Sequence, residues 1–175
     1  MKSLFFIFII SAGLFSAPAL AETGSEPATL SETDAVQRVY FKDFRSYPIH
    51  RQNAQVPDAL MALDGKQIEV VGYMVPFDRI ENITQFILLQ APFMGCMHVP
   101  PPGANETLMI ETERPLSSYT YDPLRITGTL SIDEVYVDGY LISVYTISGA
   151  RVQSSSSSDA ETEGLPDNFH FYGDM

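Results

Sequence analysis

The spacing of hydrophobic residues along the chain changes near residue 65. Before this point, the apolar side chains of Val36, Val39 and Phe44 recur near the helical period. This pattern predicts a short helix over residues 34–47. A second helical turn is predicted in the string VPDALMALDGK, because proline suits the first turn of a helix and the Asp-Gly pair ends it.

After residue 65 the pattern becomes that of β-strands. The strings KQIEVVGYMVPF, ITQFILLQ and ETLMIE predict strands, and LRITGTLSIDEVYVDGYLISVYTISGARV predicts two or three more. Asp138-Gly139 is a strong hairpin turn signal. Gly72 and Gly128 stand within predicted strands, where glycine favours a bulge or a tight bend at a barrel corner.

About five strands with little helix between them predict a mainly β fold. Because many of these strands are apolar on both sides, we expect a closed or nearly closed antiparallel sheet. A small five-stranded barrel of the oligonucleotide/oligosaccharide-binding (OB) shape fits the strand count, with one or two short N-terminal helices before it. A β-sandwich fits almost equally well.

The two ends of the chain differ from this central part. Residues 1–21 have a basic start, a short apolar run and an Ala-x-Ala site, which predicts a signal peptide cleaved after Ala21. The apolar run is too short to span a bilayer, so we expect a periplasmic chain without a transmembrane segment once it is mature. A retained interfacial anchor is the alternative. We expect a flexible leader at 22–33, one β-rich domain at 34–152 and a low-complexity acidic tail with an aromatic end at 153–175.

The charge of the chain is strongly negative. The formal net charge is −12, and removal of the signal with its one lysine leaves nine basic and 22 acidic residues, a charge of −13. Such a field repels phosphate backbones and anionic lipids, which argues against nucleic-acid binding. A cationic ligand or a basic protein surface suits this field better.

The string MGCMHVPPPGAN at residues 94–105 holds the only cysteine of the chain. Small exported domains usually contain cysteines in pairs that form disulfides. Cys96 has no such partner within the chain, so it is left to be buried, to bind a metal, to react or to cross-link to another molecule.

An extended backbone would place Cys96 and His98 on the same face, about 6.6 Å apart along the strand. A thiolate and an imidazole at that separation can converge on one metal ion. The three following residues, Pro100, Pro101 and Pro102, favour an extended backbone and would fix its direction. The same prolines are either a rigid connector between strands or a surface for a partner, and Asn105 is expected to cap or turn the chain.

A structural zinc site needs four ligands, and this string supplies two. The further candidates are His50, His170 and Glu106, which only the tertiary fold can bring close. Zinc is the first ion to consider for thiolate and imidazole ligands, and copper(I) is the second.

Two other interpretations of Cys96 remain open. In one, Cys96 is a buried inert thiol, and the protein is a structural adaptor of a transporter complex that holds no metal. In the other, the protein is a thiol-dependent enzyme. A nucleophilic cysteine needs a base and an oxyanion hole placed by the fold, and a histidine two residues away is not how those groups usually arise. We therefore do not expect an enzyme.

Three strings together resemble a known family: LDGKQIEVVGYMVPFD, FILLQAPFMGCMHVPPPGANETLMIE and YDPLRITGTLSI. They are similar to the exported bacterial family called domain of unknown function 3299, over about Ala59 to Val152. The mark of the resemblance is the string Gly-Cys-x-His-Val-Pro-Pro-Pro-x-x-Asn. A common form of the family has a fourth proline where this chain has Gly103 and a glutamine where it has Glu106.

The resemblance singles out Cys96, His98 and Asn105 by position. The activity of the family is not established, but its members are often encoded near ABC-transporter components and sometimes near zinc-responsive genes. This context implies a metal-handling accessory protein rather than a hydrolase. We therefore expect a periplasmic binding or accessory protein that holds zinc in support of a transport or envelope system, with an envelope or ABC-transporter component as its partner.

Overall fold

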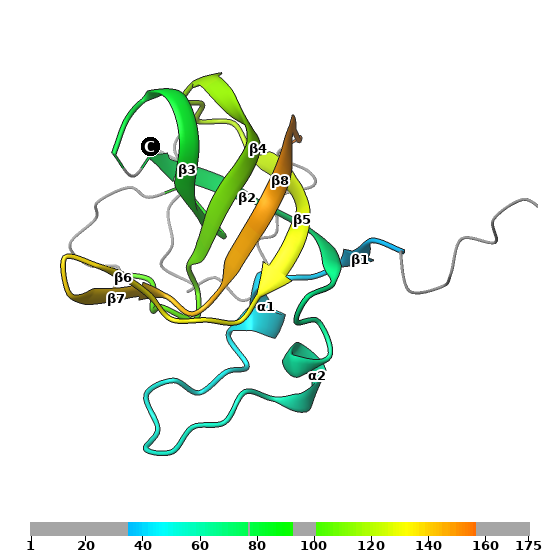
Figure 1. Ribbon diagram of the computed structural model, residues 1–175, viewed down its shortest axis with the longest axis vertical. Coiled ribbons are helices and arrows are strands. Elements are labelled where there is room, and N and C mark those ends of the chain that lie inside the picture. Colours follow the sequence, from blue (N-terminus) through cyan, green and yellow to red (C-terminus); the bar gives the residue numbers. More distant parts are fainter. Residues whose placement is uncertain (1–34, 77, 93–100, 157–175) are drawn as a thin grey trace, which may run out of the picture. The chain divides into compact units, whose positions relative to one another are not determined.

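The strands that follow residue 65 close into a ring of five in the computed structural model (Figure 1). The structure describes residues 35–76, 78–92 and 101–156, all of which belong to the compact unit Ser31–Met175. The elements in chain order are β1 (Gln37–Arg38), α1 (Phe41–Phe44), α2 (Asp58–Met61), β2 (Gln67–Pro76), β3 (Glu81–Leu89), β4 (Leu108–Ser118), β5 (Leu124–Ser131), β6 (Val135–Val137), β7 (Tyr140–Ser143) and β8 (Thr146–Ser154).

The ring has the order β2-β3-β4-β8-β5, and β5 pairs again with β2. Four of these five pairings are antiparallel, and the β4–β8 pairing is parallel. The prediction of a five-stranded OB-like barrel is therefore confirmed. A purely antiparallel ring does not form, because β8 returns from the β6–β7 hairpin to lie beside β4 in the same direction.

Two glycines stand where the barrel must bend. Gly72 is the last β2 residue paired with β5, and the following residue, Tyr73, pairs with β3. A Cβ at Gly72 would lie 2.5 Å from the carbonyl oxygen of Leu89. Gly128 lies at a register shift between β5 and β8, and a Cβ there would lie 2.8 Å from the Ser148 carbonyl oxygen. Side chains would keep the strands apart at both corners.

The β6–β7 hairpin follows the sequence prediction. Asp138 and Gly139 form its turn, with φ values of 51° and 84°. Two successive positive φ angles are those of the tight hairpin turn that matches strand twist. The hairpin is a two-stranded sheet separate from the ring.

The N-terminal helix is shorter than predicted. Residues 37–38 form β1, which pairs in parallel with β2, and α1 covers only Phe41–Phe44. The apolar spacing in this segment instead places Val39, Phe41 and Phe44 against the barrel, where each is at most 1% exposed. Pairing with β2 satisfies the backbone of residues 37 and 38 and prevails over helix propensity. The helical turn predicted after Pro57 is present as α2.

The barrel interior is filled by alternate residues of its strands. In β5, for example, Leu124, Ile126 and Leu130 are buried, and the residues between them are half-buried. The core continues beyond the barrel end into α1 and α2 through Phe41, Phe44 and Leu60, and the whole set forms one cluster. Burying each of these large side chains contributes about 2 kcal/mol to folding.

Ion pairs attach β1 to the barrel. Glu69 on β2 accepts hydrogen bonds from Arg38 on β1, at 2.7 Å, and from Arg125 on β5, at 2.5 Å. Burial raises the pKa of Glu69, but the hydrogen bonds and charges of the two arginines outweigh it, and the net result is a lowered pKa. Glu69 is therefore a carboxylate at neutral pH that joins three strands.

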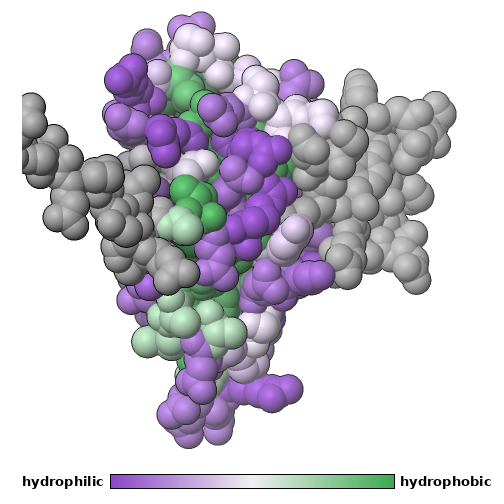
Figure 2. Space-filling model, turned by 90° about the vertical axis from the view of Figure 1, so that its right-hand side faces the viewer, coloured by the Kyte–Doolittle hydropathy of each residue, from purple (hydrophilic) through white to green (hydrophobic). Residues whose placement is uncertain are grey.

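The face of the molecule shown in Figure 2 is mostly polar where the structure describes it. On the face shown in Figure 2, hydrophobic atoms form a narrow band between hydrophilic ones. None of the helices within the described ranges has the length and apolar character needed to cross a membrane.

Candidate functional site

Residues 101–107 form the loop that leads from the proline string into β4. Pro101 and Pro102 are exposed, and Thr107 is buried. Asn105 fixes this loop to the segment after α1, because its side-chain amide donates hydrogen bonds to the carbonyl oxygens of Tyr47, at 2.9 Å, and Arg45, at 3.4 Å. Asn105 thus joins two segments that are 58 positions apart, whereas the sequence predicted only a local cap or turn.

The loop closes on itself around Gly103. The backbone N–H of Gly103 donates to Glu106 Oε2 at 2.9 Å, and the N–H of Glu106 donates to the Gly103 carbonyl oxygen at 2.8 Å. The Thr107 hydroxyl donates to the same carbonyl at 2.9 Å. These reciprocal bonds hold the Glu106 carboxylate in one orientation, with 36% of its side chain exposed.

His50 and Glu106 both have a side-chain atom near Gly103. A Cβ built on Gly103 would be 3.7 Å from His50 Nε2 and 3.7 Å from Glu106 Oε2. Both side chains were candidate ligands in the sequence, and 56 positions separate them. The fold therefore brings an imidazole and a carboxylate to one place, directly after the proline string.

A cation already lies beside this carboxylate. Arg45 Nη1 is 3.8 Å from Glu106 Oε1, and the same nitrogen donates a hydrogen bond to Gln90 Oε1. Gln90 is 6% exposed and directly follows the last residue of β3. Arg45 thus links this site to the end of β3.

Two buried hydroxyl groups hold the segments around this site, one bonded to the loop and the other to the end of α1. The Ser143 hydroxyl donates to the Thr107 carbonyl oxygen and accepts the N–H of Tyr145 at 3.0 Å. The Tyr145 hydroxyl donates to the Phe44 carbonyl oxygen at 2.8 Å. Burial, and then the nearby Tyr47, raise the pKa of Tyr145 far above its usual value, so this hydroxyl stays protonated.

The remaining predicted residues lie outside the described residues: Cys96, His98, Pro100 and His170. Within 35–76, 78–92 and 101–156, no group of three or more His, Cys, Asp or Glu side chains is placed to hold a metal ion. His50 and Glu106 are therefore a pair, and they form a metal site only with ligands from elsewhere in the chain.

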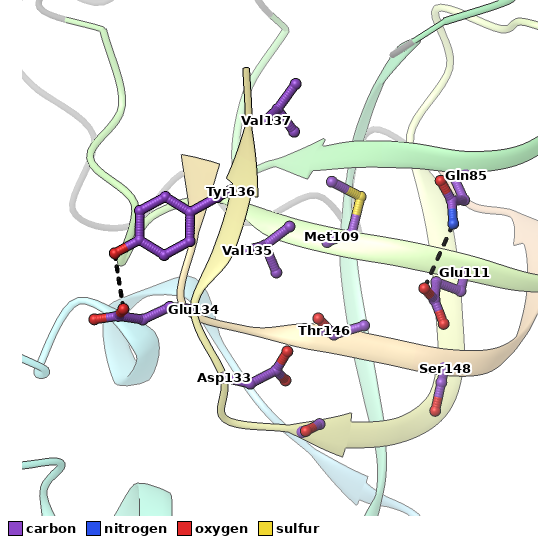
Figure 3. A pocket seen from close by; sticks show the side chains of 11 residues that line it. Gln85, Met109, Glu111, Asp133, Glu134, Val135, Tyr136, Val137, Thr146 and Ser148 are labelled. Atoms are coloured by element: carbon purple, nitrogen blue, oxygen red, sulfur yellow. Dashed lines mark hydrogen bonds between the residues drawn. The ribbon is translucent and has the colours of Figure 1, made fainter. Parts of the chain in front are cut away.

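A second feature was not predicted from the sequence as a site. An open groove of about 640 Å³ runs between the β6–β7 hairpin and the outer faces of β3, β4 and β8 (Figure 3). Glu111, Asp133 and Glu134 line it, and its eleven lining residues include no lysine or arginine. Val135 faces Met109 across the groove.

The groove occupies a place that OB folds commonly use for binding. In that fold, the face of the second and third strands and the loop between the fourth and fifth carry ligands. The corresponding elements here are β3, β4 and the connection between β5 and β8, which contains the hairpin. Its carboxylates would repel an oligonucleotide, so only the location is shared.

Comparison with known proteins identifies the family. Residues 21–154 match the family described as protein of unknown function DUF3299, which is three quarters of the chain. The chain belongs to the DUF3299 family. The resemblance seen in the sequence is therefore confirmed.

A crystal structure of a DUF3299 family protein from Pseudomonas aeruginosa PAO1, at 2.45 Å resolution, is similar to this chain. Its TM-score is 0.51, at 21% sequence identity, and the match covers 70% of this chain and 97% of the other. At that identity the similarity supports a common fold alone. The search of curated proteins finds no significant match.

The sequence identified His50, Glu106 and Asn105 as candidates in this DUF3299 protein, but it did not predict that all three lie around the loop of residues 101–107. It missed Tyr145 and Ser143, because a buried tyrosine and serine in a β pattern look like ordinary strand residues. It also missed the groove. The cluster Asp133-Glu134 ahead of a short hairpin was the available signal, but the partner Glu111 comes from β4.

Proposed function

We propose that this protein is a periplasmic metal-binding accessory protein that holds zinc through Cys96, His98, His50 and Glu106. One observation carries the proposal: His50 Nε2 and Glu106 Oε2 both lie 3.7 Å from the same point at Gly103. His98 stands five positions before Gly103, and a chain of that length spans at most about 17 Å.

The chemistry of the four side chains suits zinc. One thiolate, two imidazoles and one carboxylate are all common zinc ligands, with bonds of roughly 2.0–2.3 Å. Cys96 binds as the thiolate and His98 and His50 as neutral imidazoles, so binding weakens as acid protonates them. The exposed carboxylate of Glu106 keeps lone pairs for a metal in addition to the bond from Gly103. Copper(I) is the second ion, because cysteine is a soft ligand.

The proposed setting is the periplasm, in support of a transport or envelope system. The N-terminal pattern of a signal peptide supports export, and the family match begins at residue 21, next to the expected cleavage site. The high negative charge supports an attraction for cations.

The first experiment measures zinc in the mature chain purified without chelator. We expect one zinc per chain in the wild type, and binding at least tenfold weaker in Cys96→Ser, His98→Ala, His50→Ala and Glu106→Gln. Glu113→Gln, which removes an exposed carboxylate of β4, is the matched control and should leave zinc binding unchanged. Circular dichroism checks that each variant is folded. His170→Ala tests whether the tail supplies a ligand in place of one of the four.

Equal and negligible zinc in the wild type and all variants would overturn the proposal. Thiol labelling of native protein then separates the two alternatives. A structural adaptor with a buried Cys96 labels only after unfolding, whereas a nucleophilic thiol labels rapidly at neutral pH. Copper(I) in place of zinc, lost in the same four variants, would keep the site and change the ion.

A further inference from the structure

The groove beside the β6–β7 hairpin combines an apolar lining with carboxylates. Its apolar lining consists of Met109, which is only 5% exposed, and the half-buried Val135 and Val137. Asp133 projects from the hairpin side toward Thr146, and Glu111 projects from β4 (Figure 3). Glu111 accepts a long hydrogen bond, 3.5 Å, from Gln85.

The outer side of the hairpin extends this surface with exposed hydrophobic residues. Tyr136 is 57% exposed and is directly paired across the hairpin with Leu141. Tyr140, the residue before Leu141, is 73% exposed. The Tyr136 hydroxyl donates to Glu134 at 2.8 Å, which holds the ring at the groove margin. Exposed tyrosines of this kind supply large contact areas in protein interfaces.

A metal ion does not fit this groove. Among the residues that the structure describes, Glu111, Asp133 and Glu134 included, no three carboxylate, imidazole or thiol groups are close enough to share an ion. The volume of the groove, about 640 Å³, suits a chain segment better than a single ion.

The chain's own ends are not suitable occupants. Residues 157–175 contain five acidic residues and no lysine or arginine, and residues 22–34 contain four acidic residues and none that are basic. Both segments would bring negative charge to a groove of the same sign. A second copy of the chain, with its net charge of −12, is disfavoured for the same reason.

We propose that the groove between the β6–β7 hairpin and strands β3, β4 and β8 binds an extended, lysine- or arginine-containing segment of a partner protein. The basic side chains of the segment pair with Glu111 and Asp133, its apolar side chains contact Met109 and Val135, and Tyr136 covers its edge. This partner surface is separate from the proposed zinc site and does not depend on it.

The test uses the mature full chain and a fluorescein-labelled nonapeptide of alternating lysine and valine as the probe. A peptide of alternating glutamate and valine is the charge control. Fluorescence anisotropy should show binding of the lysine peptide alone, and binding should weaken as salt is added. The double variant Glu111→Gln/Asp133→Asn should bind about tenfold more weakly.

The matched control is Asp58→Asn/Glu81→Gln, which removes the same charge from exposed positions outside the groove. It should change the affinity by less than about twofold. Thr146→Phe keeps the charge and fills the groove, so it should also abolish binding. Circular dichroism and urea unfolding establish that each variant is folded.

Three results would overturn the proposal. Equal losses in the two double variants would show attraction to the general field of the protein. Unchanged binding in Thr146→Phe would place the peptide elsewhere. Equal binding of the glutamate peptide would remove the role of charge. Zinc content measured on the groove variants should equal that of the wild type, so a failure here leaves the proposed function standing.

Discussion

The hydroxyl of Tyr145 donates a hydrogen bond of 2.8 Å to the carbonyl oxygen of Phe44, 101 positions earlier in the chain. The two rings also touch, with centroids 4.9 Å apart. This contact joins the residue before β8 to the last residue of α1. It therefore holds the segment that carries His50 against the barrel end that carries the loop of Asn105 and Glu106.

Tyr145→Phe tests the hydrogen bond without changing the packing of the ring. The Phe44 carbonyl would lose this donor and keep only the backbone N–H of Tyr47, at 3.2 Å. We therefore expect a loss of about 0.5–1.5 kcal/mol in the free energy of unfolding, measured by urea denaturation. Tyr140→Phe, at an exposed position, is the control and should have no measurable effect. Equal effects of the two substitutions would contradict this interpretation.

The raised pKa of Tyr145 predicts how stability depends on alkaline pH. Unfolded chains ionise this tyrosine near pH 10.0, whereas the folded chain keeps it protonated. The contribution of Tyr145 is thus fully present below pH 10 and is lost as the pH rises from there toward the folded pKa. Urea unfolding between pH 8 and 11 should show a steeper decline for the wild type than for Tyr145→Phe. If the stabilities of the two proteins fell in parallel over this pH range, the raised pKa of Tyr145 would not contribute to stability.

Glu69→Gln tests the attachment of β1. The substitution removes the charge that pairs with Arg38 and Arg125, and we expect a loss of about 1 kcal/mol at pH 7. The lowered pKa of Glu69 gives a contribution that is present above the ordinary value of 4.5 and is lost as the pH falls through the folded pKa. The two proteins should therefore converge in stability in acid. Asp78→Asn, in an exposed pair with Arg79, should leave stability unchanged.

Gly72→Ala tests the barrel corner. Its Cβ would meet the Leu89 carbonyl oxygen at 2.5 Å and the Leu88 side chain at 2.8 Å. The Leu89 carbonyl belongs to the backbone of β3, which cannot move away without disturbing the strand pairing. We expect a loss of about 2–3 kcal/mol in the free energy of unfolding. Gly139→Asn is the contrast, because Gly139 is open on all sides and asparagine accepts positive φ. Its stability should stay within about 1 kcal/mol of wild type.

Asn105→Asp tests whether the loop and the segment after α1 are held together by the amide. The new carboxylate would face the carbonyl oxygens of Arg45 and Tyr47, which cannot donate to it. We expect a loss of about 1–3 kcal/mol in the free energy of unfolding and a weaker zinc site, because His50 is no longer fixed beside Glu106. Gln52→Ala, an exposed change in the same segment, should alter neither quantity.

The barrel was predictable because its signals are local. Alternation of apolar residues gave the strands, Asp138-Gly139 gave the hairpin turn, and Gly72 and Gly128 gave the corners. The same local pattern misled at residues 34–47, where pairing of β1 with β2 replaced most of the expected helix.

The sequence by itself determined which residue types are available for chemistry and which segments form strands, since both follow from composition and periodicity along the chain. Only the tertiary structure decided three relationships. β8 lies parallel to β4, His50 and Glu106 both come near Gly103, and Glu111 lines the same groove as Asp133 and Glu134. These outcomes depend on how the ring of strands closes. Closure of the ring brings together segments that are far apart in the chain. A local pattern of side chains does not specify which of these distant segments will meet.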